Sequence, residues 1–126
     1  MTAAETTSAR TRAVVEAFNH AFNRQDVAGV MALMTGDCVF ENTAPAPDGT
    51  RVEGQAAVRA AFAEFFRQSP QARFEWEEVV VMGDRCAVRW VYHWGGAGDE
   101  ASHVRGIDLF RLRDGKIAEK LSYVKG

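Results

Sequence analysis

One aspartate stands in an otherwise apolar row near the C-terminus, and its type and position make it the first candidate for chemistry. Two strands are predicted within residues 103–124, because Asp114-Gly115 between alternating apolar runs is typical of a hairpin turn. Successive side chains of a strand point to opposite faces, so Asp108 shares a face with Phe110. A buried carboxylate must be paired, hydrogen-bonded or protonated, because burial of a bare charge is unfavourable. Asp108 is therefore a candidate acid, base or hydrogen-bond donor.

The strand before this hairpin offers two partners for Asp108, because Arg89 and His93 share one of its faces. His93 would be a general base, since the unperturbed pKa of histidine lies near neutral pH. Arg89 would stabilise developing negative charge. Structural alternatives stay open: Arg89 or Lys120 forms an ion pair with Asp108, and His93 is a hydrogen-bonded structural residue.

Composition and charge argue against several classes of protein. The 126 residues, 47% of them hydrophobic, predict a single domain over 1–126 with residues 1–8 frayed. A net charge of -2 argues against nucleic acid as a partner. Without a long apolar run or a signal peptide, we expect no membrane span and a cytoplasmic location. Cys38 and Cys86 lack metal-binding spacing, so neither a metal nor another cofactor is expected.

The order of predicted elements gives the fold class. Apolar spacing and turn residues predict helices at 7–23, 27–34 and 55–68, and strands at 38–42, 73–82, 85–94 and on both sides of Asp114-Gly115. The segment 43–54 reads as a loop, because it contains two prolines and an Asp-Gly pair. We therefore expect an α+β fold of order ααβαββββ, with three N-terminal helices on a curved, mostly antiparallel sheet.

Three stretches carry a resemblance to a known family. RGIDLFRLRDGKIAEKLSY resembles the C-terminal strands of the nuclear transport factor 2-like superfamily, and most closely those of its SnoaL-like branch. FNRQDVAGVMALMTGDCVFEN is similar to the second helix and first strand of that family, and GQAAVRAAFAEFF to its third helix. The resemblance implies a cystatin-like, cone-shaped α+β barrel. It leaves activity open, because the superfamily contains isomerases, epoxide hydrolases, polyketide cyclases and binding modules.

The catalytic residues of two branches carry over only in part. Asp108 occupies the position of the acid that steroid isomerases of this fold keep protonated. The isomerase's general-base aspartate falls at Asn42, and its oxyanion-hole tyrosine falls at Phe18. The resemblance therefore implies that steroid isomerisation by that mechanism is not supported.

The limonene-epoxide-hydrolase branch is also incomplete. Its arginine and asparagine resemble Arg89 and Asn42, but its two catalytic aspartates fall at Val91 and Ser122, and its tyrosine falls at Phe40. The cyclase branch also places its acid near Ser122. The relays of these enzymes cannot be assembled from the residues present.

The register implied by the resemblance turns the Arg89 face inward and predicts a small-ligand pocket. The expected polar groups are Asp108, His93, Arg89, Asn42, Lys120 and Ser122, and the expected apolar wall is Phe18, Phe40, Phe62, Val91 and Phe110. We predict a protein that binds a small hydrophobic molecule. The alternative is an isomerase, lyase or hydrolase that acts on a hydrophobic carbonyl or polyketide-like substrate, with Asp108 and His93 as acid and base. A third reading is a dimerisation scaffold whose cavity is filled by phenylalanines.

The opposite face of the sheet suggests a partner. Eight residues are expected to point away from the helices, namely Val88, Trp90, Tyr92, Trp94, Ile107, Leu109, Leu121 and Tyr123. A contiguous apolar patch of this kind is rarely left in water by a monomer, so we expect a homodimer, which the resemblance also implies. The alternative is that sheet curvature and loops cover these rings within one chain.

Overall fold

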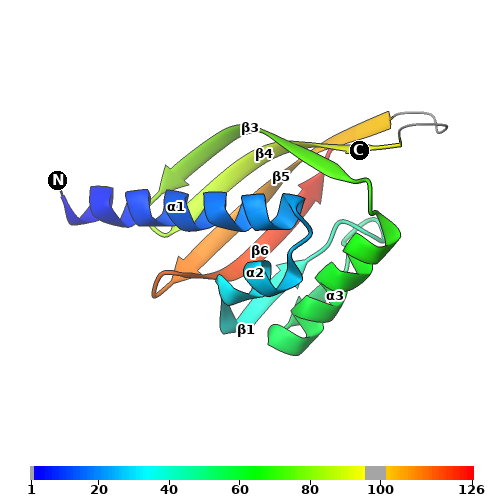
Figure 1. Cartoon of the computed structure of the whole chain (residues 1–126). Helices are drawn as coiled ribbons and strands as arrows, with labels where there is room; N and C mark the ends of the chain where they lie inside the picture. The colour runs from blue at the N-terminus through cyan, green and yellow to red at the C-terminus, as the bar shows by residue number, and fades with distance from the viewer. Residues whose placement is uncertain (1, 96–101) are drawn as a thin grey trace.

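The computed structural model describes residues 2–95 and 102–126, and these residues form the expected α+β fold. The elements in chain order are α1 (Ala3–Asn23), α2 (Val27–Ala32), β1 (Met34–Glu41), β2 (Arg51–Glu53), α3 (Gln55–Gln68), β3 (Arg73–Met82), β4 (Arg85–Trp94), β5 (Ser102–Arg113) and β6 (Lys116–Val124) (Figure 1). One element was missed: the short strand β2 lies within the segment expected to be a loop. None of the helices in the described ranges is long and apolar enough to cross a membrane.

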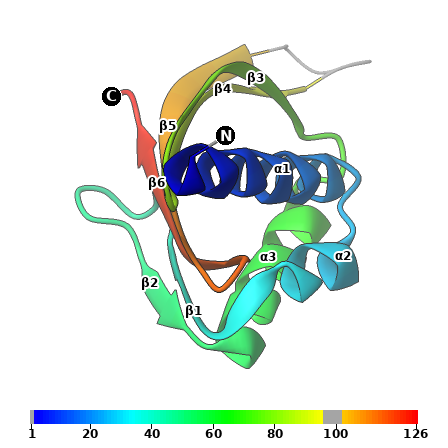
Figure 2. The ribbon, with the colours of Figure 1, turned by 90° about the vertical axis from the view of Figure 1, so that its left-hand side faces the viewer.

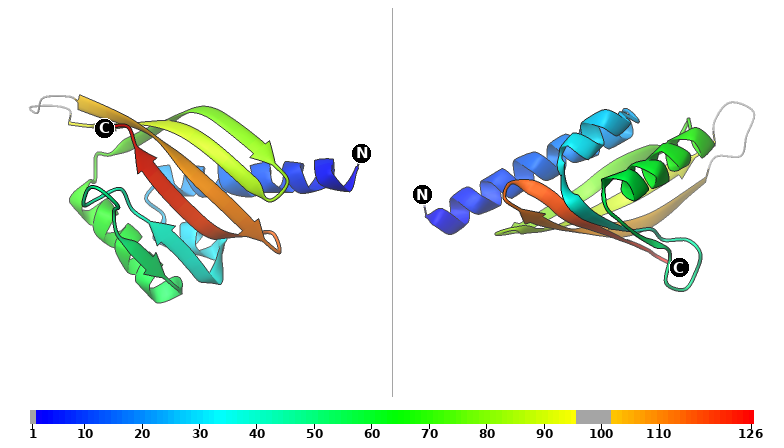
Figure 3. Two further views of the ribbon diagram at one scale, coloured as in Figure 1. Left: turned by 180° about the vertical axis from the view of Figure 1, so that it is seen from behind. Right: turned by 90° about the horizontal axis from the view of Figure 1, so that it is seen from below.

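The strands form one curved sheet in the order β2-β1-β6-β5-β4-β3. The pairing of β1 with β6 is parallel, and the other neighbouring pairs are antiparallel. The three helices lie on the concave side of this sheet (Figure 2). Seen from behind, the strands β4, β5 and β6 present an outer face that no helix of the described chain crosses (Figure 3).

The first helix begins earlier than expected. Thr2 caps it, because its Oγ1 accepts a hydrogen bond of 3.1 Å from the backbone N–H of Glu5. Two hydroxyls of the first turns then hold the β3–β4 turn: Ser8 Oγ accepts from the N–H of Gly83 at 2.9 Å, and Thr11 Oγ1 donates to its carbonyl at 2.7 Å. Residues 3–8 therefore belong to the helix, where the sequence predicted a frayed N-terminus.

The C-terminal hairpin has the predicted turn. Asp114 and Gly115 have φ values of 53° and 78°, the left-handed conformation of a two-residue hairpin turn. The turn sets a register in which Asp108 lies opposite Ser122, and Phe110 lies opposite Lys120. These four residues therefore belong to the same face of the sheet, which is the concave one.

The face of β4 that meets the helices is the opposite of the one predicted. Trp90 packs against Phe74 with ring centroids 5.5 Å apart, and Tyr92 packs against Phe65 at 5.9 Å. Trp90 and Tyr92 therefore do not belong to the outer face. The sheet buries the aromatic row and leaves Arg89 exposed, because burial of ring surface is favourable and burial of a guanidinium is not.

Candidate functional site

A cavity of about 190 Å³ lies between the helices and the concave face of the sheet. Its walls are mostly aromatic and come from α1, α3, β1, β3 and β4: Phe22, Phe40, Phe62, Phe65, Phe74, Trp90 and Tyr92. The polar side chains in its lining are Asn42, Thr43, Asp108, Lys120 and Ser122, and Val104 and Val124 complete it. A few polar groups in an apolar cavity are typical of a small-molecule site.

Three of these polar side chains form a connected cluster on β5 and β6. Ser122 Oγ donates a hydrogen bond of 2.6 Å to Asp108 Oδ1, and Lys120 Nζ donates one of 3.1 Å to Ser122 Oγ. Lys120 Nζ also lies 3.5 Å from Asp108 Oδ2. Asp108 is 5% exposed and Lys120 is 7% exposed. Because both charges are buried, each depends on the other for compensation.

Aromatic rings surround the ammonium group of Lys120. Its Nζ lies 4.9 Å from the ring centroid of Phe40, 5.2 Å from that of Phe22 and 5.9 Å from that of Phe62. The negative face of an aromatic ring attracts a cation at such distances. The cavity therefore stabilises one positive charge in apolar surroundings.

Trp90 forms part of the cavity wall on β4, where it lies opposite Gly106 of β5. It is 5% exposed, and its indole Nε1 has no hydrogen-bond partner among the described residues. Its ring lies over Gly106, where an added Cβ would come within 2.3 Å of Trp90 Cζ2 and 2.4 Å of the Tyr123 carbonyl oxygen. The absence of a side chain at Gly106 is therefore what lets the indole form this wall.

The structure brings six of the predicted pocket residues to the cavity: Asp108, Lys120, Ser122, Asn42, Phe40 and Phe62. The Oδ1 of Asn42 accepts a hydrogen bond of 2.7 Å from the N–H of Thr43, so this amide also holds the start of the following loop.

Three predicted wall residues lie elsewhere. Phe18 and Phe110 are packed in the core, with ring centroids 5.6 Å apart, and do not line the cavity. Val91 is buried on the other face of β4 and does not line it either. The placement of Phe18, Phe110 and Val91 in the pocket was wrong.

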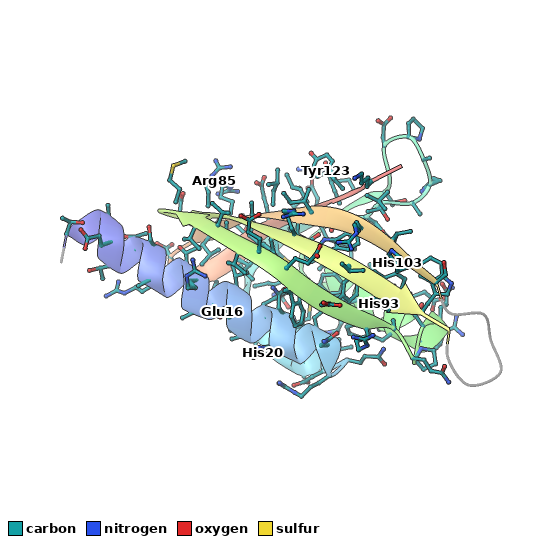
Figure 4. All side chains as sticks on the ribbon, turned by 90° about the horizontal axis from the view of Figure 1, so that it is seen from above. Glu16, His20, Arg85, His93, His103 and Tyr123 are labelled. Carbon is teal, nitrogen blue, oxygen red and sulfur yellow. The ribbon has the colours of Figure 1, made fainter. Side chains whose placement is uncertain are left out.

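The predicted cluster of Asp108, His93 and Arg89 does not form. His93 Nε2 lies 3.1 Å from Glu75 Oε1, and Arg89 Nη1 lies 3.2 Å from Glu78 Oε1, both on the outer face. His93 lies beside His103 near the ends of β4 and β5 (Figure 4). Asp108 points to the concave side, so the sheet separates it from His93. An acid/base pair of these two residues is therefore excluded.

The prediction missed most of the aromatic wall. The alternation of Trp90 and Tyr92 with Arg89 and His93 would have identified the inward face of β4, because an amphipathic strand turns its apolar row toward the core. The described residues contain no group of three or more histidine, cysteine or acidic side chains placed to hold a metal ion.

Comparison with known proteins identifies relatives. The SnoaL-like domain family matches residues 15–120. A structure of an NTF2-like protein of unknown function from Mesorhizobium loti is 39% identical, with a TM-score of 0.80, over 94% of this chain and 93% of that one. The structure of a "putative polyketide cyclase" from Xanthomonas campestris pv. campestris is 25% identical, with a TM-score of 0.74, over 94% of this chain and 93% of that one.

A more distant structure shares the fold. The uncharacterized cystatin fold protein from Novosphingobium aromaticivorans is 22% identical, with a TM-score of 0.75, over 89% of this chain and 96% of that one. No curated protein is similar enough to count as a relative. Because the family match spans most of the chain, the protein belongs to the SnoaL-like domain family, within the nuclear transport factor 2-like superfamily.

Proposed function

We propose that the protein binds a small, neutral, mostly apolar molecule that carries a carbonyl or similar acceptor oxygen. The observation that supports this most directly is the buried cluster of Asp108, Lys120 and Ser122 in an otherwise aromatic cavity. The volume of about 190 Å³ suits a ligand of one or two rings, since a cavity of roughly 150 Å³ holds benzene.

The charges of the cluster indicate a neutral ligand. Lys120 and Asp108 compensate each other, so a charged ligand would enter an apolar cavity without a counter-ion. Lys120 has one ammonium hydrogen directed at Ser122 and others available, which would donate to an acceptor oxygen. Within the described parts of the chain, Asp108 Oδ2 has only the 3.5 Å approach of Lys120, so it would accept a hydrogen bond from a ligand hydroxyl. A molecule with an adjacent donor and acceptor would use both.

A matched pair of ligands tests this proposal. α-Tetralone and tetralin have the same two-ring shape and differ in one carbonyl group. A hydrogen bond to a charged donor contributes about 1.5–3 kcal/mol, so we expect α-tetralone to bind at least about tenfold more tightly by calorimetry. Lys120→Met should remove that preference and keep the binding of tetralin.

A variant that fills the cavity provides the control. Phe62→Trp adds ring volume to the wall and should abolish binding of both compounds, whereas Ala63→Trp adds the same ring to an exposed position of α3 and should not. Absence of binding by either compound to the unaltered protein, or binding that survives Phe62→Trp, would overturn the proposal.

We also propose that the outer face packs against a second copy of the chain, through a patch that differs from the predicted one. Val80, Ala87, Leu109 and Leu121 lie opposite one another on β3, β4, β5 and β6 and form a continuous apolar row. Ile107 and Tyr123 lie beside this row. Trp94 lies on the same face of β4 as Trp90 and Tyr92, with its ring centroid 5.5 Å from that of Tyr92, so it does not belong to this patch.

The charged side chains beside this row are already paired within the chain, which suits a second copy as the occupant. The apolar row is flanked by ion pairs that are already made within the chain, such as Arg89–Glu78 and Arg111–Glu119, each at 3.2 Å. A two-fold arrangement would lay row against row without burying an unpaired charge.

Sedimentation equilibrium tests this interface. We expect a dimer that Leu109→Glu converts to a monomer and that Ala63→Glu, the same charge on an exposed helix position, leaves intact. A monomeric unaltered protein at tens of micromolar, or a dimeric Leu109→Glu variant, would contradict it.

A further inference from the structure

Lys120 is the one buried member of a small set of lysines. The sequence has 15 basic residues, of which only Lys116, Lys120 and Lys125 are lysines. Lys116 and Lys125 are exposed, while Lys120 lines the cavity. Arginine is the usual choice for a buried ion pair, because its guanidinium is always charged and binds carboxylates at two points. At this position the chain instead has a primary amine, which is able to lose its proton and act as a nucleophile.

The hydrogen bonds of the cluster run in the direction that would produce this neutral amine. Lys120 Nζ donates to Ser122 Oγ at 3.1 Å, and Ser122 Oγ donates to Asp108 Oδ1 at 2.6 Å. A shift of one proton along each bond gives a neutral amine, an unchanged hydroxyl and a carboxylic acid.

We propose that Lys120 captures the carbonyl carbon of an aldehyde or ketone as an iminium ion. The amine nitrogen attacks the carbonyl carbon, and the C=O π electrons move to oxygen, which takes up one proton from the attacking nitrogen to give a neutral carbinolamine. The acid formed at Asp108 then protonates the hydroxyl group, the C–O bond breaks, and water leaves as the C=N bond forms. The ammonium ion and the carbonyl compound thus give the iminium ion and one water molecule, with charge conserved.

The surroundings of Lys120 suit the product as well as the amine. The iminium ion keeps the single positive charge at the same nitrogen, 3.5 Å from Asp108 Oδ2. The three phenyl rings whose centroids lie within 5.9 Å of Nζ then face an iminium cation in place of the ammonium ion. No new charge is created in the apolar cavity, so capture does not require a new counter-ion.

Reductive trapping tests this inference, which rests on the proposed binding of carbonyl compounds. The unaltered protein is incubated with benzaldehyde and sodium cyanoborohydride, and the benzylated positions are quantified by peptide mass spectrometry. Lys116 and Lys125, on the same strand or next to it, serve as exposed internal references. Because the cavity concentrates the aldehyde next to the amine, we expect Lys120 to be labelled at least about tenfold faster than either.

Variants distinguish the reactivity of the Lys120 amine from the access of the aldehyde to the cavity. Lys120→Arg keeps the charge and should abolish labelling at this position, whereas Ser122→Ala interrupts the hydrogen-bonded path and should slow labelling about tenfold. Lys116→Arg should leave the rate at Lys120 unchanged.

The outcomes distinguish this inference from the proposal on which it rests. If α-tetralone binds but Lys120 is labelled no faster than Lys116 and Lys125, capture is refuted and binding stands. If α-tetralone does not bind and Lys120 is not labelled preferentially, both fail. The comparison is made within the unaltered protein, so it does not depend on whether any variant folds.

Discussion

Removal of one charge from the buried pair should destabilise the protein far more than removal of both. Asp108→Asn keeps the shape of the side chain and the acceptor for Ser122, but it leaves Lys120 in the cavity without a counter-ion. Lys120→Met leaves the carboxylate of Asp108 equally uncompensated. Both groups are at most 7% exposed, so solvent screening is weak. Each single substitution should therefore lower the free energy of unfolding by about 3–5 kcal/mol.

The double variant measures the coupling free energy between the two charges, which is a stricter test than either single substitution. If the effects added, Asp108→Asn with Lys120→Met would lower the free energy of unfolding by about 6–10 kcal/mol. A buried pair replaced as a unit is often close to neutral, so we expect a loss of about 2 kcal/mol or less. The coupling free energy should then exceed about 4 kcal/mol. Urea unfolding followed by circular dichroism measures all four proteins, with unchanged m-values as the check on two-state behaviour.

An exposed pair on the outer face is the matched control. Arg89 and Glu78 are separated by 3.2 Å, and their side chains are 56% and 50% exposed. Exposed ion pairs contribute about 0–1 kcal/mol, so Arg89→Met with Glu78→Gln should show a coupling of less than about 1 kcal/mol. Equal coupling in the buried and exposed cycles would refute the view that the cavity holds a desolvated ion pair.

Three further predictions concern the wall, the surface and the core. Gly106→Ala should displace the Trp90 ring, lower the free energy of unfolding by about 1–3 kcal/mol and shift the tryptophan emission, because the new Cβ would lie 2.3 Å from Cζ2; an unchanged spectrum and stability would contradict it. The hydrogen bond from Arg113 holds the pKa of Asp37 at about 2, below its usual 3.8. Its stabilisation is therefore present above pH 3.8 and is lost as the pH falls toward 2, and Asp37→Asn should flatten that limb of the stability profile measured by urea unfolding. Burial raises the pKa of the Cys86 thiol to about 11, so iodoacetamide should modify it only after unfolding, and rapid modification of the native protein would disprove this.

Local rules predicted most of the elements, because the signals lie within a few residues. Asp114-Gly115 marks a turn whose conformation follows from residue type, and the parity of the following strands places Lys120 and Ser122 on the face of Asp108. The short strand β2 was missed because it depends on pairing with β1, which no local pattern in a proline-containing segment reveals.

The choice of face on β4 failed for a different reason. A shift of one residue in strand register moves every side chain to the opposite face. An error of one residue in a register taken from a family resemblance therefore misplaces every side chain of the strand. β4 and β5 pair without an irregularity, with Val88 opposite Asp108 and Trp90 opposite Gly106, so Val88 and Trp90 share the inward face of Asp108. The apolar alternation of β4 itself was the better guide.

The place of β6 in the sheet has a consequence for how the protein is made. β6 follows the other described strands in the sequence, yet it lies between β1 and β5 and, among the described strands, joins the two parts of the sheet. During synthesis the helices and the first two strands therefore emerge before the strand that completes the sheet, with phenylalanines such as Phe40 and Phe62 still uncovered. Loss of this one strand would separate β1 and β2 from β3, β4 and β5 and leave both parts without a completed core, so an incomplete chain would expose apolar surface that favours aggregation.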